Sequence, residues 1–259
     1  MSFPNLSVRT FLLLTIVQFA CVAQTIEPVL QPLGLQSGDQ YRLVFVTSQQ
    51  RDATSTNIDD YNEFVQSVAD ASPIVGSWGL EWKAIASTVT VDARDNIGAG
   101  PDDQILPVYR LDGIQFVAPG NGPLFEFESD PESPRIGPVM FTELGTIPPA
   151  SDSRFILGAE VWTGTDSEGT AADILGPLGG NDEGAAAYGD SLDGRAAVYF
   201  DGSQPVTLKA RFYGISSVVT VVPEPSNGVC VMLVPCLFLF HKLRSKHQRL
   251  RYGQRKRPT

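Results

Sequence analysis

The sequence predicts an α+β domain with long loops, placed between two hydrophobic chain ends. Apolar side chains recur at helical spacing over 58–71, and short strand-like runs follow from Trp82 onward. Stretches crowded with Gly, Pro and Asp separate these runs. We therefore divide the chain into an apolar N-terminal segment at 1–23, an acidic domain at 24–222 and a C-terminal segment at 223–259.

The N-terminal end is typical of a secretory signal peptide. Arg9 precedes the apolar run FLLLTIVQFACVA, and the small residues Cys21 and Ala23 stand at the positions that a signal peptidase reads. We expect a signal helix that is cleaved after Ala23. The alternatives are a buried element of the fold, an uncleaved anchor or a lipoprotein attached at Cys21, although the residues before Cys21 fit a lipobox poorly.

The C-terminal end reads VPEPSNGVCVMLVPCLFLF, and eight Lys and Arg residues follow it. The apolar run 229–240 is shorter than the roughly 20 residues that cross hydrocarbon comfortably, and Pro235 interrupts it. The basic flank nevertheless predicts a membrane helix. Cations hold their side of a span in the cytoplasm, and long basic side chains reach the headgroups.

The order of Pro223-Glu224-Pro225, an apolar segment and an arginine-rich end resembles the PEP-CTERM sorting signal of exported bacterial proteins. The resemblance implies a membrane processing enzyme of the exosortase type, which cuts near the Pro-Glu-Pro. It also implies that the C-terminal helix anchors the protein in the cytoplasmic membrane before processing, and that the body then reaches the cell surface or the extracellular space. The alternative, a Pro-rich turn before an ordinary tail anchor, gives nearly the same topology.

Charge divides the chain in the same way. One of its 19 basic residues lies in the signal peptide and eight lie in the tail, which leaves ten for residues 24–240, where all 29 acidic residues lie. The overall charge of −10 therefore combines a basic tail with an exported part of charge −19. Because an acidic surface repels phosphate backbones, we expect no nucleic-acid partner.

The exported domain contains neither cysteine nor histidine, since all three cysteines and both histidines lie in the two chain ends. This composition excludes disulfides, a Ser-His-Asp triad and a histidine-bound zinc in the domain. We therefore predict a non-catalytic protein without catalytic residues. The alternative is a carbohydrate-active enzyme that uses two carboxylates facing each other across an aromatic-lined cleft.

The first predicted elements of the domain are a buried strand and a long helix. The strand YRLVFVTS, residues 41–48, has apolar side chains on both faces. Thr56 and Asp59 predict a capping box at the start of the helix 58–71. The apolar face of this helix consists of Ile58, Tyr61, Val65 and Val68.

Short strands dominate the rest of the domain. They are predicted at WKAIAST, TVTVDARDN, LPVYRLDGIQFV, RFILGAEVWTG, AAVYF and TLKARFYGISSVVTVV. Asp112-Gly113 predicts a two-residue hairpin turn within the third of these runs. The stretch 119–152 is predicted to be mostly irregular, and the Gly- and Ala-rich stretch 167–194 is predicted to be an exposed loop.

Three segments of the domain resemble the endostatin-type branch of the C-type-lectin-like fold: EWKAIASTVTVDARDN, LPVYRLDGIQF and AEVWTGTDSEGT. The resemblance implies an α+β lectin-like fold that recognises a glycan, such as an exopolysaccharide, or another protein at the cell surface. The segments YRLVFVTS, RDATST, TVDARDN and RFYGISS are also similar to an uncharacterised domain of many PEP-CTERM proteins. The chain lacks the disulfides and the basic patch of endostatin-like domains, so their heparin binding is not carried over.

No cofactor is expected, and calcium is the metal that the acidic loops suit. Calcium prefers carboxylate and amide oxygens supplied by loops. EF-hand spacing is absent, however, and acidic loops of a strongly acidic domain are ordinarily solvated surface. Asp92 and Asp95 also flank Arg94, where a buried ion pair or a turn is the alternative role. The candidate ligands are Asp92, Asp95, Asn96, Asp182 and Glu183.

The three tryptophans are candidates for a surface on which sugar rings stack. Hydrophobic neighbours predict instead that Trp82 and Trp162 lie in the core. Trp78, in the Gly-flanked stretch GSWGL, is predicted to be the more exposed one.

Overall fold

The computed structural model describes residues 25–100, 106–117, 125, 138–148, 160–180, 184–191 and 202–222. The predicted signal peptide with its cleavage site at Ala23 and the predicted sorting signal with Pro223, Glu224 and Pro225 lie outside the described residues. These assignments therefore stay predictions. Among the described residues, no helix is both long and apolar enough to cross a membrane.

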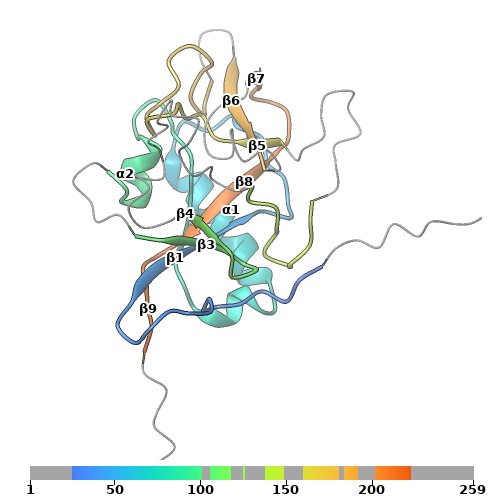
Figure 1. Ribbon diagram of the computed structural model, residues 1–259. Coiled ribbons are helices and arrows are strands. Elements are labelled where there is room, and N and C mark those ends of the chain that lie inside the picture. The colour runs from blue at the N-terminus through green and yellow to red at the C-terminus, as the bar shows by residue number, and fades with distance from the viewer. Residues whose placement is uncertain are drawn as a thin grey trace, which may run out of the picture.

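The centre of the molecule is a nine-stranded mixed sheet (Figure 1). Seven of its strands follow the order β4-β3-β1-β8-β5-β6-β7, while β2 pairs with β8 and β9 pairs with β1. The β1–β3 and β5–β8 pairs are parallel, and the other strand pairs are antiparallel. The strands are β1 (Gln40–Val46), β2 (Trp82–Ala84), β3 (Val108–Arg110), β4 (Gln115–Val117), β5 (Glu160–Trp162), β6 (Ala185–Asp190), β7 (Gly202–Pro205), β8 (Arg211–Ser216) and β9 (Val219–Thr220).

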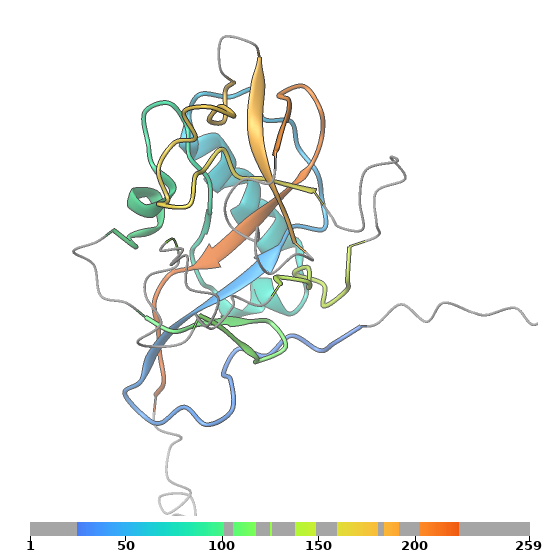
Figure 2. The same cartoon turned by 45° about the horizontal axis from the view of Figure 1, so that its top comes forward.

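Strands β1 and β8 lie side by side in the middle of the sheet, as Figure 2 shows in blue and orange. Their side chains alternate between two apolar layers, because successive residues of a strand point to opposite faces. Leu43 and Phe45 belong to one buried cluster, and Val44 and Val46 belong to the other. The predicted buried strand 41–48 is thus confirmed as β1, which ends at Val46.

Helix α1 (Ile58–Ala71) covers the face of the sheet that carries Leu43 and Phe45 (Figure 1). Tyr61 stacks on Phe212 of β8 with ring centroids 5.1 Å apart. The helix has the predicted bounds, and its four predicted apolar residues are all buried. The predicted capping box is wrong: Asn57 is the N-cap, and its side-chain oxygen accepts a hydrogen bond from the backbone N–H of Asp59 at 3.2 Å.

The opposite face of the sheet packs on α2 (Ala93–Ile97) and on neighbouring loops. Ala93 and Ile97 join Val44, Val46 and Ile215 in the second buried cluster. The run TVTVDARDN was expected to be a strand, but its second half forms this short helix. Val89 is 62% exposed, so the alternation of valines in this run does not mark a buried strand face.

The prediction of an α+β, C-type-lectin-like fold is wrong, because the described part of the chain is mostly β-sheet. Its helices are α1, the five-residue α2 and the short 3-10 turn η1 (Val75–Trp78). The segments that suggested a lectin do form local elements, including the hairpin at Asp112-Gly113 between β3 and β4. Short local motifs define such turns and strand ends, but they do not determine the order of strands in a sheet.

The stretch 167–194 contributes more structure than an exposed loop. It contains β6, in which Ala186 and Ala187 are fully buried. Leu178 is also fully buried, and its backbone N–H donates to the carbonyl of Ser87 at 2.9 Å. Alanine and glycine are generally depleted in strands, so composition alone did not predict β6.

Candidate functional site: a polar pocket beside helix α2

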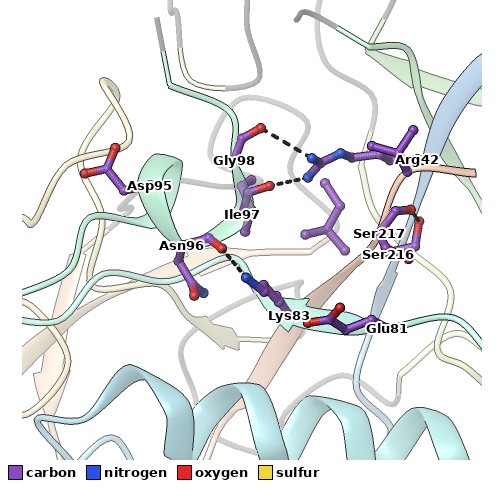
Figure 3. A pocket seen from close by; sticks show the side chains of 11 residues that line it. Arg42, Glu81, Lys83, Asp95, Asn96, Ile97, Gly98, Ser216 and Ser217 are labelled. Carbon is purple, nitrogen blue, oxygen red and sulfur yellow. Dashed lines mark hydrogen bonds between the residues drawn. The ribbon is translucent and has the colours of Figure 1, made fainter. Parts of the chain in front are cut away.

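A pocket of about 290 Å³ opens beside the C-terminal end of α2 (Figure 3). Its walls come from four parts of the fold: β1, β2, the end of α2 and the turn after β8. The residues that matter for its chemistry are Arg42, Glu81, Lys83, Asp95, Asn96 and Ser217. No aromatic residue lines it. The pocket is therefore polar and charged, and it is held by a rigid sheet on one side.

Lys83 lies in the middle of β2 between the buried residues Trp82 and Ala84. Strand alternation turns its half-buried side chain to the pocket, away from the cluster that holds its two neighbours. Its ammonium donates one hydrogen bond, to the backbone carbonyl of Asn96 at 3.1 Å. An ammonium has three donors, and no described carboxylate lies within 4.0 Å of this one. Lys83 therefore retains donor capacity toward the pocket.

Arg42 closes the pocket from the side of β1. Its guanidinium donates to the carbonyl oxygens of Ile97 and Gly98, the latter at 3.3 Å, and Figure 3 shows it reaching across toward them. These carbonyls belong to the end of α2, where a helix leaves acceptors without partners inside the helix. Gly98 ends the helix with a φ of +63°, a left-handed conformation that favours glycine. Arg42 thus fixes the end of α2 against the sheet.

Asn96 forms the pocket wall with its backbone, while its side chain faces the interior. Its amide nitrogen donates to the carbonyl of Ala84 at 2.8 Å and to Asn62 Oδ1 at 3.0 Å. Asn62 Nδ2 donates back to Asn96 Oδ1 at 2.9 Å. Asn62 Oδ1 also accepts from the backbone N–H of Ala84 at 2.9 Å. This pair of asparagines joins α1, β2 and α2, and so holds the pocket in shape.

The sequence-predicted calcium ligands have separate roles in the structure. Asp92 Oδ1 accepts from the backbone N–H of Ala171 at 2.9 Å. Asp92 Oδ2 lies 3.7 Å from the Arg94 guanidinium, but both side chains are partly exposed, so this ion pair is not the buried one that the sequence suggested. Asp95 is exposed and lines the pocket, and the Asn96 side chain is used within the fold. In the described ranges, no group of three or more His, Cys, Asp or Glu side chains is placed to hold a metal. Asp182 and Glu183 lie outside those ranges, and calcium binding stays a prediction.

A second polar cluster, which the sequence did not reveal, lies where β1 ends. Glu143 is only 2% exposed, and its carboxylate accepts hydrogen bonds from the backbone N–H of Ser48 at 2.8 Å and from the Ser48 hydroxyl. Burial raises the pKa of the Glu143 carboxyl, an effect that the hydrogen bonds from Ser48 oppose in part. Arg211 is buried nearby and donates to the carbonyls of Thr47 and Ser48. This cluster ties the loop 138–148 to β1 and faces no described pocket.

The tryptophans do not form a binding surface. Trp82 and Trp162 are buried, as predicted, with 2% and 1% of their surface exposed. Trp78 is half-buried and packs against the main apolar cluster. The pocket beside α2 therefore offers a ligand hydrogen-bonding groups and no aromatic faces.

Neither the known protein families nor the curated proteins contain a match: no family model fits the chain, and no curated protein is similar to it in sequence. The chemistry of the pocket is accordingly the basis for assigning a function.

Proposed function

We propose that the chain is an exported cell-surface or extracellular protein that recognises a glycan or another protein without catalysis. The observation that carries this proposal is the polar pocket in which Lys83, half-buried, retains donors for a ligand. Binding pockets of this kind combine a rigid wall with a few placed polar groups, which provide orientation and specificity. The network of Asn62 and Asn96 supplies such a wall here.

Composition and geometry favour binding over hydrolysis. The exported domain has no histidine or cysteine, so acid–base chemistry would rest on carboxylates, Tyr or Lys. Glu81 and Asp95 line the pocket but are exposed, whereas a carboxylic acid catalyst needs surroundings that keep it protonated. The pocket also lacks the aromatic lining that a carbohydrate-active enzyme of the alternative type was expected to have.

The composition of the two chain ends supports export and sorting. In this proposal a signal peptide directs the acidic body out of the cytoplasm, and an exosortase-like enzyme processes the C-terminal signal at the membrane. Val222, which directly precedes Pro223, is 74% exposed. The last described residue of the body therefore lies at the surface.

Binding and catalysis are separated by one assay on the full chain. The purified protein is mixed with surface polysaccharide of its native host, and both retention of protein on the polysaccharide and release of reducing ends are measured. We expect retention without release. Release of reducing ends that is lost in Glu81→Gln or Asp95→Asn would establish the enzyme instead. The absence of retention would leave a protein ligand, to be sought by crosslinking on the cell surface.

Sorting is tested in the native host with a tag on the body. Replacement of Pro223, Glu224 and Pro225 by alanine should leave membrane insertion intact but keep the body tethered, because proline holds the segment extended for a protease. The membrane-bound, surface and released fractions are compared with those of the wild type. An unchanged distribution would mean that the motif is only a spacer before a plain anchor.

A further inference from the structure

We propose that the pocket beside α2 binds the carboxylate of an acidic sugar, with Lys83 as the residue that holds it. This inference rests on the proposed function and specifies the ligand class of the same site. It begins with the charge of Lys83. Lys83 is half-buried, its ammonium donates to one carbonyl, and in the described part of the chain no carboxylate pairs with it. A charge withdrawn from water is stabilised when an opposite charge completes its hydrogen bonds.

The charged side chains around the pocket favour a ligand that carries both an anionic group and hydroxyl groups. Lys83 and Arg42 are half-buried, whereas Glu81 and Asp95 are exposed. Carboxylates accept hydrogen bonds from hydroxyl groups, and an ammonium or guanidinium donates to a carboxylate. A sugar acid presents both partners, one carboxylate for the inner cation and several hydroxyls for the outer acceptors. A neutral sugar would leave the Lys83 ammonium without an anion.

The backbone around the pocket disfavours phosphate and sulfate esters. Anions of that kind are typically bound by the N–H groups of a helix N-terminus or by a free arginine fork. Here the C-terminal end of α2 borders the pocket, and its carbonyl oxygens at Ile97 and Gly98 already occupy the Arg42 guanidinium. These carbonyls repel a multiply charged group but accept hydrogen bonds from sugar hydroxyls. The geometry thus favours a singly charged carboxylate among hydroxyls.

The size of the pocket limits how much of a glycan it holds. Its volume of about 290 Å³ is at the lower end of small-molecule sites. The turn after β8 that forms one wall is fixed, because the backbone N–H of Ser217 donates to the carbonyl of Glu81 at 2.7 Å. We therefore expect one acidic residue of a chain or a chain end to enter the pocket. The acidic surface of the domain provides no long-range attraction for it.

The test uses the full chain in detergent and two probes, a short oligogalacturonate and a neutral galactan oligomer of equal length. Affinities are measured by isothermal titration calorimetry at low and high salt for the wild type and three variants. Lys83→Gln removes the charge at similar length, and Lys83→Arg keeps the charge. Lys209→Gln removes an exposed cation that does not line the pocket. Melting curves confirm that each variant is folded.

We expect the wild type to bind the acidic probe in preference to the neutral one, and to bind it more weakly at high salt. Lys83→Gln should weaken binding of the acidic probe by roughly tenfold or more, the size expected for one charge-assisted contact. Lys83→Arg should retain most of the affinity, and Lys209→Gln all of it. Equal binding of both probes, or an unchanged affinity of Lys83→Gln, would overturn the inference and leave glycan recognition standing. If neither probe binds, the inference also fails, and retention on host polysaccharide then decides independently whether the proposed function stands.

Discussion

Truncation of Asn62 to alanine should cost more stability than its half-buried position suggests. The substitution removes the partner of the Ala84 backbone N–H and the donor to Asn96 Oδ1, and it takes one of two acceptors from the Asn96 amide nitrogen. An orphaned buried polar group costs about 1–3 kcal/mol. The substitution orphans two such groups, the Ala84 N–H and Asn96 Oδ1, and water partly reaches them. We therefore expect the free energy of unfolding to fall by about 3 kcal/mol. For a domain of this size, that loss lowers the Tm by roughly 6–12 °C.

Chemical denaturation of the Asn62→Ala variant provides the measurement, with Ser67→Ala as the control. Ser67 lies on the same helix, and its exposed hydroxyl bonds only within α1, so its removal should change stability by less than about 0.5 kcal/mol. The double variant of Asn62 and Asn96 should cost less than the sum of the single variants, because the two side chains share their hydrogen bonds. A loss below about 0.5 kcal/mol for Asn62→Ala, or strict additivity, would refute the role given to this network.

Three other predictions concern the core and the chain ends. Burial raises the pKa of the Glu143 carboxyl, so the folded state binds a proton at this group more readily than the unfolded state does. The stability that this difference contributes is present at low pH and is lost as the pH rises through the raised pKa. Glu143→Gln should therefore gain stability relative to the wild type between mildly acidic and neutral pH in urea titrations, and parallel pH profiles would contradict this. Gly214→Ala should destabilise by about 1–3 kcal/mol, because its Cβ would lie 2.7 Å from Phe45 Cζ; a denaturation midpoint equal to that of the wild type would count against this packing. Mass spectrometry of protein from the native host should find residues 1–23 removed, and an intact Met1 would disprove the signal peptide.

The sequence predicted the elements whose causes are local. The helix 58–71 results from apolar residues that repeat within its own length. The hairpin predicted at Asp112-Gly113 forms between β3 and β4, but its connection runs over four residues, 111–114, and not over two. The core positions of Trp82 and Trp162 were also predictable from their hydrophobic neighbours. In each case the decisive information lies within a few residues of the element.

The elements and contacts that were missed depend on distant partners. Asn96 was interpreted as a calcium ligand, but its side chain is used by Asn62, 34 residues away, and by the backbone of Ala84. Glu143 stands in a loop without any local signal, and its role depends on Ser48, 95 residues away. Strand β6 is composed mostly of alanine, glycine and aspartate, which are depleted in strands, and pairing with β5 and β7 overrides that preference. The composition of a segment does not indicate which distant residues it will contact.

The central place of β8 has a consequence for when the body can fold. Its partner β1 lies near the start of the described residues, and the backbone N–H of Leu43 donates to the Ser216 hydroxyl across 173 residues of chain. Without residues 211–216, the sheet lacks the strand that joins β1 to β5 and the side chains that complete both buried layers. Contacts between segments so far apart in sequence form late and slowly. The nascent chain therefore cannot complete this sheet until nearly all of residues 24–222 have been synthesised.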